Sequence, residues 1–367
     1  MECSRVDLFN NFYKDKRVLV TGHTGFKGSW LSIWLNELGA KVVGYGLDPY
    51  TEDDNFIVTG LKDKVIDIRG DIRDYKNLLE VFNTYKPEIV FHLAAQALVK
   101  KSYKNPRETY ETNVMGTLNV LECIKNSDSV KVSIMITTDK CYKNIEQIWG
   151  YKENDPMGGY DPYSSSKGCA EILIDSYMNS FINPKDYDSH GKSIATVRAG
   201  NVIGGGDWSS DRIVPDCIRA LKENKEIEIR NPKAVRPWQH VLEPLSGYLL
   251  LASKMQVDGV SYCSGWNFGP NENSIVSVKH IVDTIILEWG YGKCLDASSE
   301  NAPHEANILK LDCTKAKTYL KWSPKLNVYE ALKLTVDWYK NSKDKDMFDL
   351  CVNQIKSYCN KTSKEVI

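Results

Sequence analysis

Short apolar runs alternate with longer segments of helical period through the first half of the chain. The runs are rich in Val, Ile and Leu, and the longer segments repeat apolar residues every three or four positions. This alternation predicts βαβ units, and hence an α/β fold with a doubly wound parallel sheet. The predicted strands are 17–21, 41–46, 64–68, 88–92, 132–137 and 193–197. The predicted helices between them are 28–38, 76–85, 109–125 and 162–181.

The second half of the chain is punctuated differently. Beyond Arg198, glycines and prolines separate shorter elements, beginning with the triplet Gly204-Gly205-Gly206. This change of pattern after Arg198 predicts a first domain at 1–198 and a smaller mixed α/β region at 199–360. The last residues, 361–367, are predicted to form a polar tail. The helices predicted in the second region are 215–223, 242–254, 278–289 and 329–341.

Composition narrows the class of protein. The chain has 367 residues, 47 Lys and Arg against 48 Asp and Glu, and a net charge of −1, without the basic excess typical of nucleic-acid binding. No apolar run is long enough to span a membrane, and the acidic start does not resemble a signal peptide, so we expect a cytoplasmic protein that binds neither nucleic acid nor membrane. The 10 cysteines and 6 histidines are scattered, which favours reduced thiols and no metal site.

A glycine-rich turn follows the first predicted strand. Gly22, Gly25 and Gly28 are spaced Gly-x-x-Gly-x-x-Gly and open a predicted helix. Glycine lets a pyrophosphate approach the backbone at the positive end of a helix, so this turn predicts a Rossmann-type dinucleotide site, although a tight βα turn without a ligand has the same pattern. The residues expected to contact the cofactor here are Gly22, Thr24, Gly25, Phe26, Lys27 and Gly28.

An acidic residue stands where a ribose ligand is expected. Asp48 follows the second strand and lies 20 residues beyond Gly28. A carboxylate there accepts hydrogen bonds from the ribose hydroxyls and repels a 2′-phosphate, which favours NAD over NADP, although a solvated loop acid is the alternative. Further cofactor contacts are expected after the third and fourth strands, at Asp71, Ile72, Leu93, Ala94 and Ala95.

Candidate catalytic groups follow the fifth strand. Thr138, Asp139 and Lys140 come at its carboxyl end, which borders the ligand crevice of an open α/β sheet. Tyr163 and Lys167 lie one turn apart on a predicted helix. An ammonium beside a phenol lowers the tyrosine pKa from about 10, so Tyr163 is predicted to remove a hydroxyl proton.

These features together resemble the extended short-chain dehydrogenase/reductase family, in its nucleotide-sugar-modifying branch, over residues 14–340. Within that branch the chain is similar to the CDP-glucose 4,6-dehydratases, a family of deoxysugar biosynthesis that includes the synthesis of lipopolysaccharide O-antigen. The segments that carry the resemblance are Thr21–Trp30, Thr138–Tyr142, Arg198–Trp208 and Arg236–Val241.

The resemblance implies a redox-neutral dehydration with NAD as a retained cofactor. The C4 hydroxyl of CDP-glucose is oxidised, water is eliminated across C5 and C6, and the hydride returns to C6. Tyr163 is then the base at O4, Lys167 its pKa tuner and ribose anchor, and Thr138 a hydrogen-bond partner of O4. The thymidine-sugar dehydratases carry an Asp-Glu pair where this chain has Asp139-Lys140. Lys140 serves as the C5 base only if burial or a cation depresses its pKa by several units, and otherwise it is an acid or stabilises the enolate. Asp139 is expected to work at C6 or C5, with the acid as its favoured role.

The second region is expected to bind the nucleotide diphosphate sugar. Arg236 is the leading candidate because a guanidinium holds a diphosphate with a planar fork. The other predicted substrate ligands are Gln96, Asn201, Arg212 and His240, of which His240 is also read as a structural histidine. The helices at 109–125 and 162–181 are expected to pair in a homodimer or homotetramer.

Two other functions remain open at this point. A nucleotide-sugar 4-epimerase or decarboxylase shares the oxidation step but does not need the Asp139-Lys140 pair. A catalytically silent NAD-binding protein has no chemical need for Thr138, Tyr163 and Lys167 together.

Overall fold

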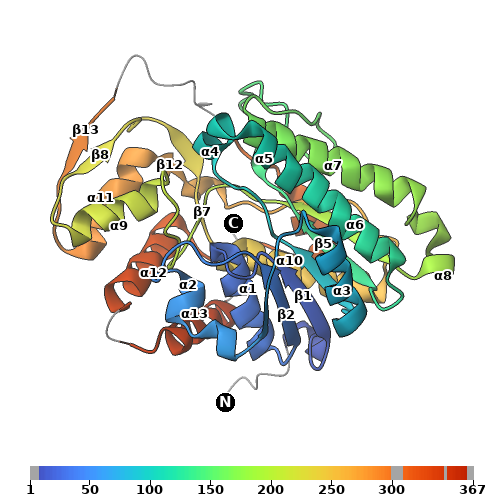
Figure 1. The fold of residues 1–367 in the computed structure, drawn as a ribbon. Helices are drawn as coiled ribbons and strands as arrows, with labels where there is room; N and C mark the ends of the chain where they lie inside the picture. The colour runs from blue at the N-terminus through green and yellow to red at the C-terminus, as the bar shows by residue number, and fades with distance from the viewer. Residues whose placement is uncertain (1–7, 299–308, 343–344, 362–367) are drawn as a thin grey trace.

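The core of the protein is a sheet of seven parallel strands, seen in the computed structural model of residues 8–298, 309–342 and 345–361 (Figure 1). The strand order is β3-β2-β1-β4-β5-β6-β11, with a crossover on each side of β1. The strands are β1 (Arg17–Thr21), β2 (Lys41–Gly46), β3 (Ile66–Arg69), β4 (Ile89–His92), β5 (Val132–Ile136), β6 (Ser193–Arg198) and β11 (Gly265–Asn267). The predicted doubly wound α/β fold is confirmed.

Both faces of the sheet are covered by helices. In β1, Leu19 faces one hydrophobic core while Val18 and Val20 face the other, because side chains alternate along a strand. Helices α3, α6 and α7 fill the first core, and α1 and α10 belong to the second (Figure 1). The helices before β6 are α1 (Phe26–Glu37), α2 (Asn55–Val58), α3 (Tyr75–Tyr85), α4 (Val99–Lys104), α5 (Pro106–Tyr110), α6 (Gly116–Asn126), α7 (Pro162–Ser180) and α8 (Tyr187–His190).

The second half adds helices and three small strand pairs to this frame. The pairs are β7 (Val202–Ile203) with β10 (Gln239–His240), β9 (Val235–Pro237) with β12 (Ile275–Ser277), and β8 (Ile227–Ile229) with β13 (Cys294–Asp296). The helices are α9 (Ile213–Lys222), α10 (Leu242–Val257), α11 (Val278–Trp289), α12 (Val328–Asn341) and α13 (Met347–Asn360). No helix in the described ranges is long and apolar enough to cross a bilayer.

The structure departs from the predicted organisation in several places. The seventh strand, β11, comes from the second region, so the sheet crosses the predicted boundary after Arg198. This strand has only three residues, which are too few to show a periodic pattern in the sequence. The predicted helix at 109–125 is divided by a π-helical turn at Glu111–Met115 between α5 and α6. Helices α2, α4, α8 and α13 and the three small strand pairs were not predicted. Of the predicted tail, Lys361 forms an ion pair of 2.6 Å with Glu330, and 362–367 lie outside the described residues.

A buried ion pair joins the end of β6 to α7. The guanidinium of Arg198 donates from Nε and Nη2 to the two carboxylate oxygens of Glu171 at 2.9 and 2.8 Å, and the side chains are 5% and 4% exposed. The hydroxyl of Thr137 donates to the same carboxylate, and Nη1 of Arg198 donates to the phenol of Tyr142 at 2.6 Å. The pair therefore holds both sides of the loop that carries Thr138, Asp139 and Lys140.

We expect removal of one member of this pair to be strongly destabilising. Glu171→Ala leaves a buried guanidinium without its charge partner and lowers the free energy of unfolding by about 3–5 kcal/mol. The double variant Glu171→Leu/Arg198→Met removes both charges and recovers much of that loss. Urea unfolding measures both effects. A Glu171→Ala protein within about 1 kcal/mol of wild type would contradict this role.

Candidate active site

The glycine turn packs tightly against the end of β4. Gly22 has φ +73°, and a Cβ there would lie 2.8 Å from the Cα of Ala94. A Cβ on Gly28 would lie 2.1 Å from the carbonyl oxygen of Gly22. The packing of the protein itself therefore requires these two glycines. Their close backbone contacts let α1 begin immediately after the turn that follows β1.

Gly25 is different because no packing contact requires it. It is the exposed N-cap of α1, its φ of −74° suits any residue, and the nearest atom to an added Cβ is the Gly22 carbonyl oxygen at 3.4 Å. The open side of Gly25 faces outward at the positive end of a helix of 12 residues. This arrangement fits a pyrophosphate that approaches the backbone, as the sequence predicted for a dinucleotide.

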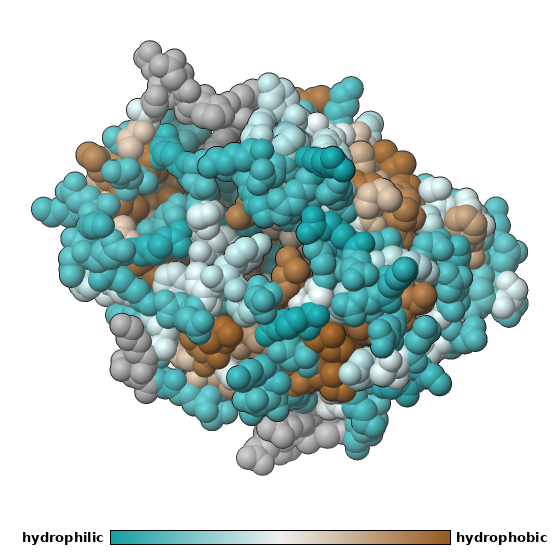
Figure 2. All heavy atoms as spheres, viewed as in Figure 1, coloured by the Kyte–Doolittle hydropathy of each residue, from teal (hydrophilic) through white to brown (hydrophobic). Residues whose placement is uncertain are grey.

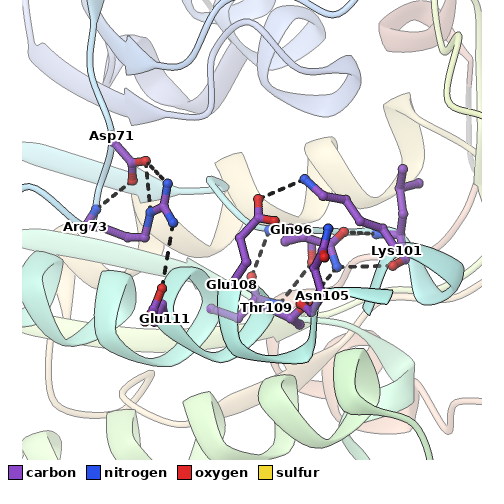
Figure 3. A network of polar contacts seen from close by, with 10 residues as sticks. Asp71, Arg73, Gln96, Lys101, Asn105, Glu108, Thr109 and Glu111 are labelled. Atoms are coloured by element: carbon purple, nitrogen blue, oxygen red, sulfur yellow. Dashed lines mark hydrogen bonds and ion pairs between the residues drawn. The ribbon is translucent and has the colours of Figure 1, made fainter. Parts of the chain in front are cut away.

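The acids expected around the adenosine lie at the edge of this site. Asp48 follows β2, with its side chain 86% exposed and an oxygen 3.6 Å from Nε of Arg69. The carboxylate of Asp71 is held by Arg73, with contacts of 2.9 and 2.6 Å (Figure 3). Partial burial opposes it, but these bonds lower the pKa of Asp71. Ile72 is buried. Asp48 is thus open to a ligand, whereas Asp71 already has an internal partner.

Gln96 belongs to a buried polar network (Figure 3). Its Nε2 donates to the carbonyl of Leu98 at 3.1 Å and to the hydroxyl of Thr109 at 2.9 Å, and its Oε1 accepts from the backbone N–H of Leu98 at 2.7 Å. The side chain of Asn113 accepts a hydrogen bond from the backbone N–H of Gln96 and donates one to the backbone carbonyl of Gln96. The amide of this predicted substrate ligand thus shapes the turn before α4 and ties it to α5.

Thr138, Asp139 and Tyr163 meet beyond the end of β5. The hydroxyl of Thr138 donates to Oδ1 of Asp139 at 2.9 Å. Thr138 also lies within hydrogen-bonding reach of the Tyr163 phenol, which acts to lower the pKa of Tyr163. The three side chains are 6%, 2% and 9% exposed. The structure therefore brings the predicted base at O4, its hydrogen-bonding threonine and one candidate acid into a single enclosed group.

Burial controls the ionisation of the Tyr-Lys pair. It raises the pKa of Tyr163 to about 12, against the predicted lowering, while the bond from Thr138 and the charge of Arg212 act in the opposite direction. Burial also lowers the pKa of Lys167 to about 8. The ammonium of Lys167 donates to the carbonyl oxygen of Ile136 at 3.3 Å.

Asp139 and Lys140 are neighbours in sequence but not in environment. Asp139 points into the protein, whereas Lys140 is exposed. Burial was one of the two conditions on which Lys140 could serve as a base, and the structure does not meet it. Enolate stabilisation by a solvated ammonium does not need burial, so that role fits the observed environment better.

Gly200 makes room for the Asp139 carboxylate, and Gly200 was not among the predicted site residues. A Cβ at residue 200 would lie 1.7 Å from Oδ2 of Asp139, so no other residue fits without moving the acid. The carbonyl of Gly200 accepts from Nε2 of the buried Gln239 at 3.1 Å. The motif after β6 contained this glycine, but its spacing gave no sign that it packs on residue 139.

Charged side chains from both halves of the chain act on the same cluster. Arg212 pairs with the buried Asp207 at 2.9 Å and acts electrostatically on Tyr163. Lys27 extends from the first turn of α1 to within electrostatic range of Asp139 and Lys167. Burial and then the charge of Arg212 lower the pKa of Lys27 to about 8. Lys27 was predicted only as a cofactor contact, so the structure adds it to the surroundings of Asp139.

The remaining predicted substrate ligands separate into two kinds. Arg236 on β9 is partly exposed and donates to the carbonyl of Val235 at 2.9 Å, and Asn201 has the left-handed φ of +48° at the turn before β7. His240 is completely buried with its ring edge against Trp30, and burial lowers its pKa to about 3. His240 is therefore a neutral core residue, and the prediction that it binds substrate is wrong.

Comparison with known proteins identifies the family. The model of the GDP-mannose 4,6 dehydratase family matches residues 19–335, so the chain belongs to this family of nucleotide-sugar dehydratases. It is 50% identical over 355 residues to the CDP-glucose 4,6-dehydratase of Salmonella typhimurium (strain LT2), and the match covers 96% of this chain and 99% of the relative. The chain is thus an enzyme of the hydro-lyase class, and the predicted resemblance is confirmed.

Solved structures share the fold at lower identity. The UDP-glucose 4-epimerase of Thermotoga maritima, determined with UDP-glucose, has a TM-score of 0.75 and 24% identity over 89% of this chain and 100% of its own. The dTDP-glucose 4,6-dehydratase of Bacillus anthracis, determined with NAD, has a TM-score of 0.73 and 22% identity over 92% of this chain and 99% of its own. These matches show the fold alone.

The glycine turn allows a paired test. Gly25→Ala adds a Cβ where only a ligand would meet it, so we expect unchanged thermal stability and a Kd for NAD raised about tenfold or more, a loss of about 1.4 kcal/mol. Gly28→Ala drives a Cβ into backbone and costs about 2 kcal/mol or more of stability. Thermal melts with titration calorimetry separate the two effects. An unchanged Kd in Gly25→Ala would show that no pyrophosphate lies there.

Proposed function

We propose that this chain converts CDP-D-glucose to CDP-4-dehydro-6-deoxy-D-glucose with NAD as a retained cofactor. The observation that carries the proposal is the enclosed group of Thr138, Asp139 and Tyr163 beside the open turn at Gly25. An oxidation at C4 needs the tyrosine and the cofactor, and loss of water from C6 needs an acid. The relative in Salmonella, which shares half of its residues with this chain, is named for this reaction.

The cofactor would be held by the turn at Gly22–Gly28, by Asp48 and by Lys167, and when bound it supplies the acceptor and donor of the hydride. The chain's own residues manage protons. Tyr163 removes the proton of the C4 hydroxyl, because ketone formation at C4 requires that loss. The resulting ketone acidifies the C5–H bond and makes the elimination feasible. Asp139 donates a proton to the departing C6 oxygen, and exposed Lys140 stabilises the C5 enolate or accepts its proton.

The nucleotide is placed by a pocket beside Arg236. This pocket has a volume of about 310 Å³ and is lined by residues from β9 and its approach, by Ile275 of β12, and by Leu309 and Lys310. Its walls combine aliphatic side chains with the amide of Asn231 and the cations of Lys233 and Lys310. The aliphatic and amide groups suit an uncharged nucleobase, and the two lysines suit the diphosphate attached to it. Arg212 lies nearer to Tyr163, where it meets the sugar end of the diphosphate.

We propose that the protein forms a homodimer or a homotetramer in the cytoplasm. Helices α5, α6 and α7 lie side by side at one flank of the molecule (Figure 1). Large apolar side chains remain exposed there, with Met115 at 50%, Ile172 at 62% and Phe181 at 53%. A second copy would cover this surface by a two-fold interface. A monomeric mass in light scattering would contradict the assembly.

Turnover of a panel of nucleotide sugars tests the function. With NAD present, we expect CDP-glucose to give a 4-keto product, seen by its absorbance in alkali, with kcat/KM at least about tenfold above UDP-glucose and dTDP-glucose. Arg236→Gln should raise KM about tenfold or more while changing kcat little, since the diphosphate contact is kept throughout the reaction. Production of a C4 epimer in place of a ketosugar would favour the alternative epimerase function.

The role of Lys140 is tested separately. If Lys140 accepts the C5 proton, Lys140→Met keeps NAD binding and abolishes exchange of the C5 hydrogen with deuterium from solvent, because the variant lacks the amine that takes this proton. NMR of the recovered nucleotide sugar measures the exchange. Lys140→Arg keeps the charge and is the control for enolate stabilisation. Exchange at near the wild-type rate in Lys140→Met would remove the residue from the base role.

A further inference from the structure

The Asp139 carboxylate is held between the loop after β5 and the turn after β6. We propose that Gly200 and Gln239 are positioning residues, which fix this carboxylate where it can protonate the departing C6 oxygen. The inference rests on the proposed dehydration and adds two residues that take no part in the proton transfers themselves. It also gives a role to the glutamine of the segment Arg236–Val241, which the dehydration alone does not explain.

The two carboxylate oxygens of Asp139 have different neighbours. Oδ1 accepts a hydrogen bond of 2.9 Å from the hydroxyl of Thr138. Oδ2 lies against Gly200, where an added Cβ would be 1.7 Å from it. Asp139 is 2% exposed, so its carboxylate has little room to rotate. Each oxygen has two lone-pair positions, so Oδ2 can still carry a proton for a ligand while Gly200 limits where that oxygen lies.

Gln239 fixes the peptide of Gly200. Its Nε2 donates to the carbonyl oxygen of Gly200 at 3.1 Å and to that of Phe268 at 3.0 Å. Its backbone N–H donates to the carbonyl oxygen of Asn201 at 3.3 Å. Phe268 follows β11 directly, so one side chain ties the turn after β6 to the neighbouring strand of the sheet. Gln239 is 2% exposed, so water does not compete for these bonds.

The turn after β6 needs such support because its backbone is strained. Asn201 has a φ of +48°, in the left-handed region that residues other than glycine adopt at a cost. The strand β7 begins directly after it and pairs with β10, which carries Gln239. A shift of about 1 Å in Gly200 would press its Cα on Oδ2 or free that oxygen, and a misplacement of this size can lower a rate about a hundredfold.

A misplaced Asp139 affects the second step of the reaction and spares the first. Oxidation moves a hydride from C4 to NAD and the proton of the C4 hydroxyl to Tyr163. Elimination passes the C5 proton to a base, the electron pair left at C5 forms the C5–C6 double bond, and the C6 oxygen leaves as water with the proton of Asp139. Slow elimination therefore accumulates the 4-ketohexose together with reduced cofactor. A general loss of folding or of substrate binding slows both steps and accumulates neither.

The test follows the absorbance of reduced cofactor after CDP-glucose is mixed with the full-length protein and NAD. Gly200→Ala drives a Cβ into Oδ2, so we expect kcat to fall about a hundredfold and reduced cofactor to fill most active sites before the steady state. Gln239→Met keeps the length of the side chain and removes both donated bonds, so we expect a fall of about tenfold with the same signal. Asp139→Asn should give the signal expected when the acid itself is lost.

Gln354→Met is the matched control. Gln354 is also buried, and its Nε2 donates to the carbonyl oxygen of Leu334, which joins α13 to α12 at 3.0 Å. We expect this variant to lose stability as Gln239→Met does, without any accumulation of reduced cofactor. If thermal melts show that Gly200→Ala does not fold, Gln239→Met decides the outcome.

The positioning role is overturned if Gly200→Ala and Gln239→Met keep the wild-type rate, or slow without accumulating reduced cofactor. Asp139→Asn separates this failure from a failure of the acid, since it should accumulate reduced cofactor whether or not the other two residues act through it. If the wild-type protein forms no ketosugar, the proposed dehydration fails and the positioning role falls with it.

Discussion

Parallel pairing of the strands is the constraint on which the rest of the molecule depends. It brings the carboxyl ends of β1, β4, β5 and β6 to one edge of the sheet, where the chain must turn into a helix or loop each time. The turn after β1 exposes Gly25, the loop after β5 carries Thr138 and Asp139, and the turn after β6 contributes Gly200. Residues more than 170 positions apart therefore meet within one site. Figure 2 shows a hollow near the centre of this face of the molecule.

Within that frame, burial sets the chemistry. Tyr163, Thr138 and Asp139 are all nearly enclosed, and the charges of Arg212 and Lys27 act on Tyr163 and Asp139 respectively. The buried ion pair of Arg198 with Glu171 lies next to the loop that carries Thr138 and Asp139 and bonds Thr137 and Tyr142 on its two sides.

Much of this arrangement could be predicted from sequence because it depends on local patterns. Strand and helix periods located six strands and the main helices, and the spacing of Gly22, Gly25 and Gly28 located the turn. The pattern could not show which glycine is required by packing and which leaves room for a ligand, since that depends on Ala94, far along the chain. For the same reason the contact between Gly200 and Asp139 was missed. The burial of His240 and the raised pKa of Tyr163 also follow from tertiary packing, which residue spacing does not report.

The proposed 4,6-dehydration is tested most directly by NMR of the product formed from CDP-glucose and NAD in deuterium oxide. We expect a C4 ketone or its hydrate, a methyl group at C6 and deuterium at C5. A product that keeps its C6 hydroxyl, with or without inversion at C4, would contradict it.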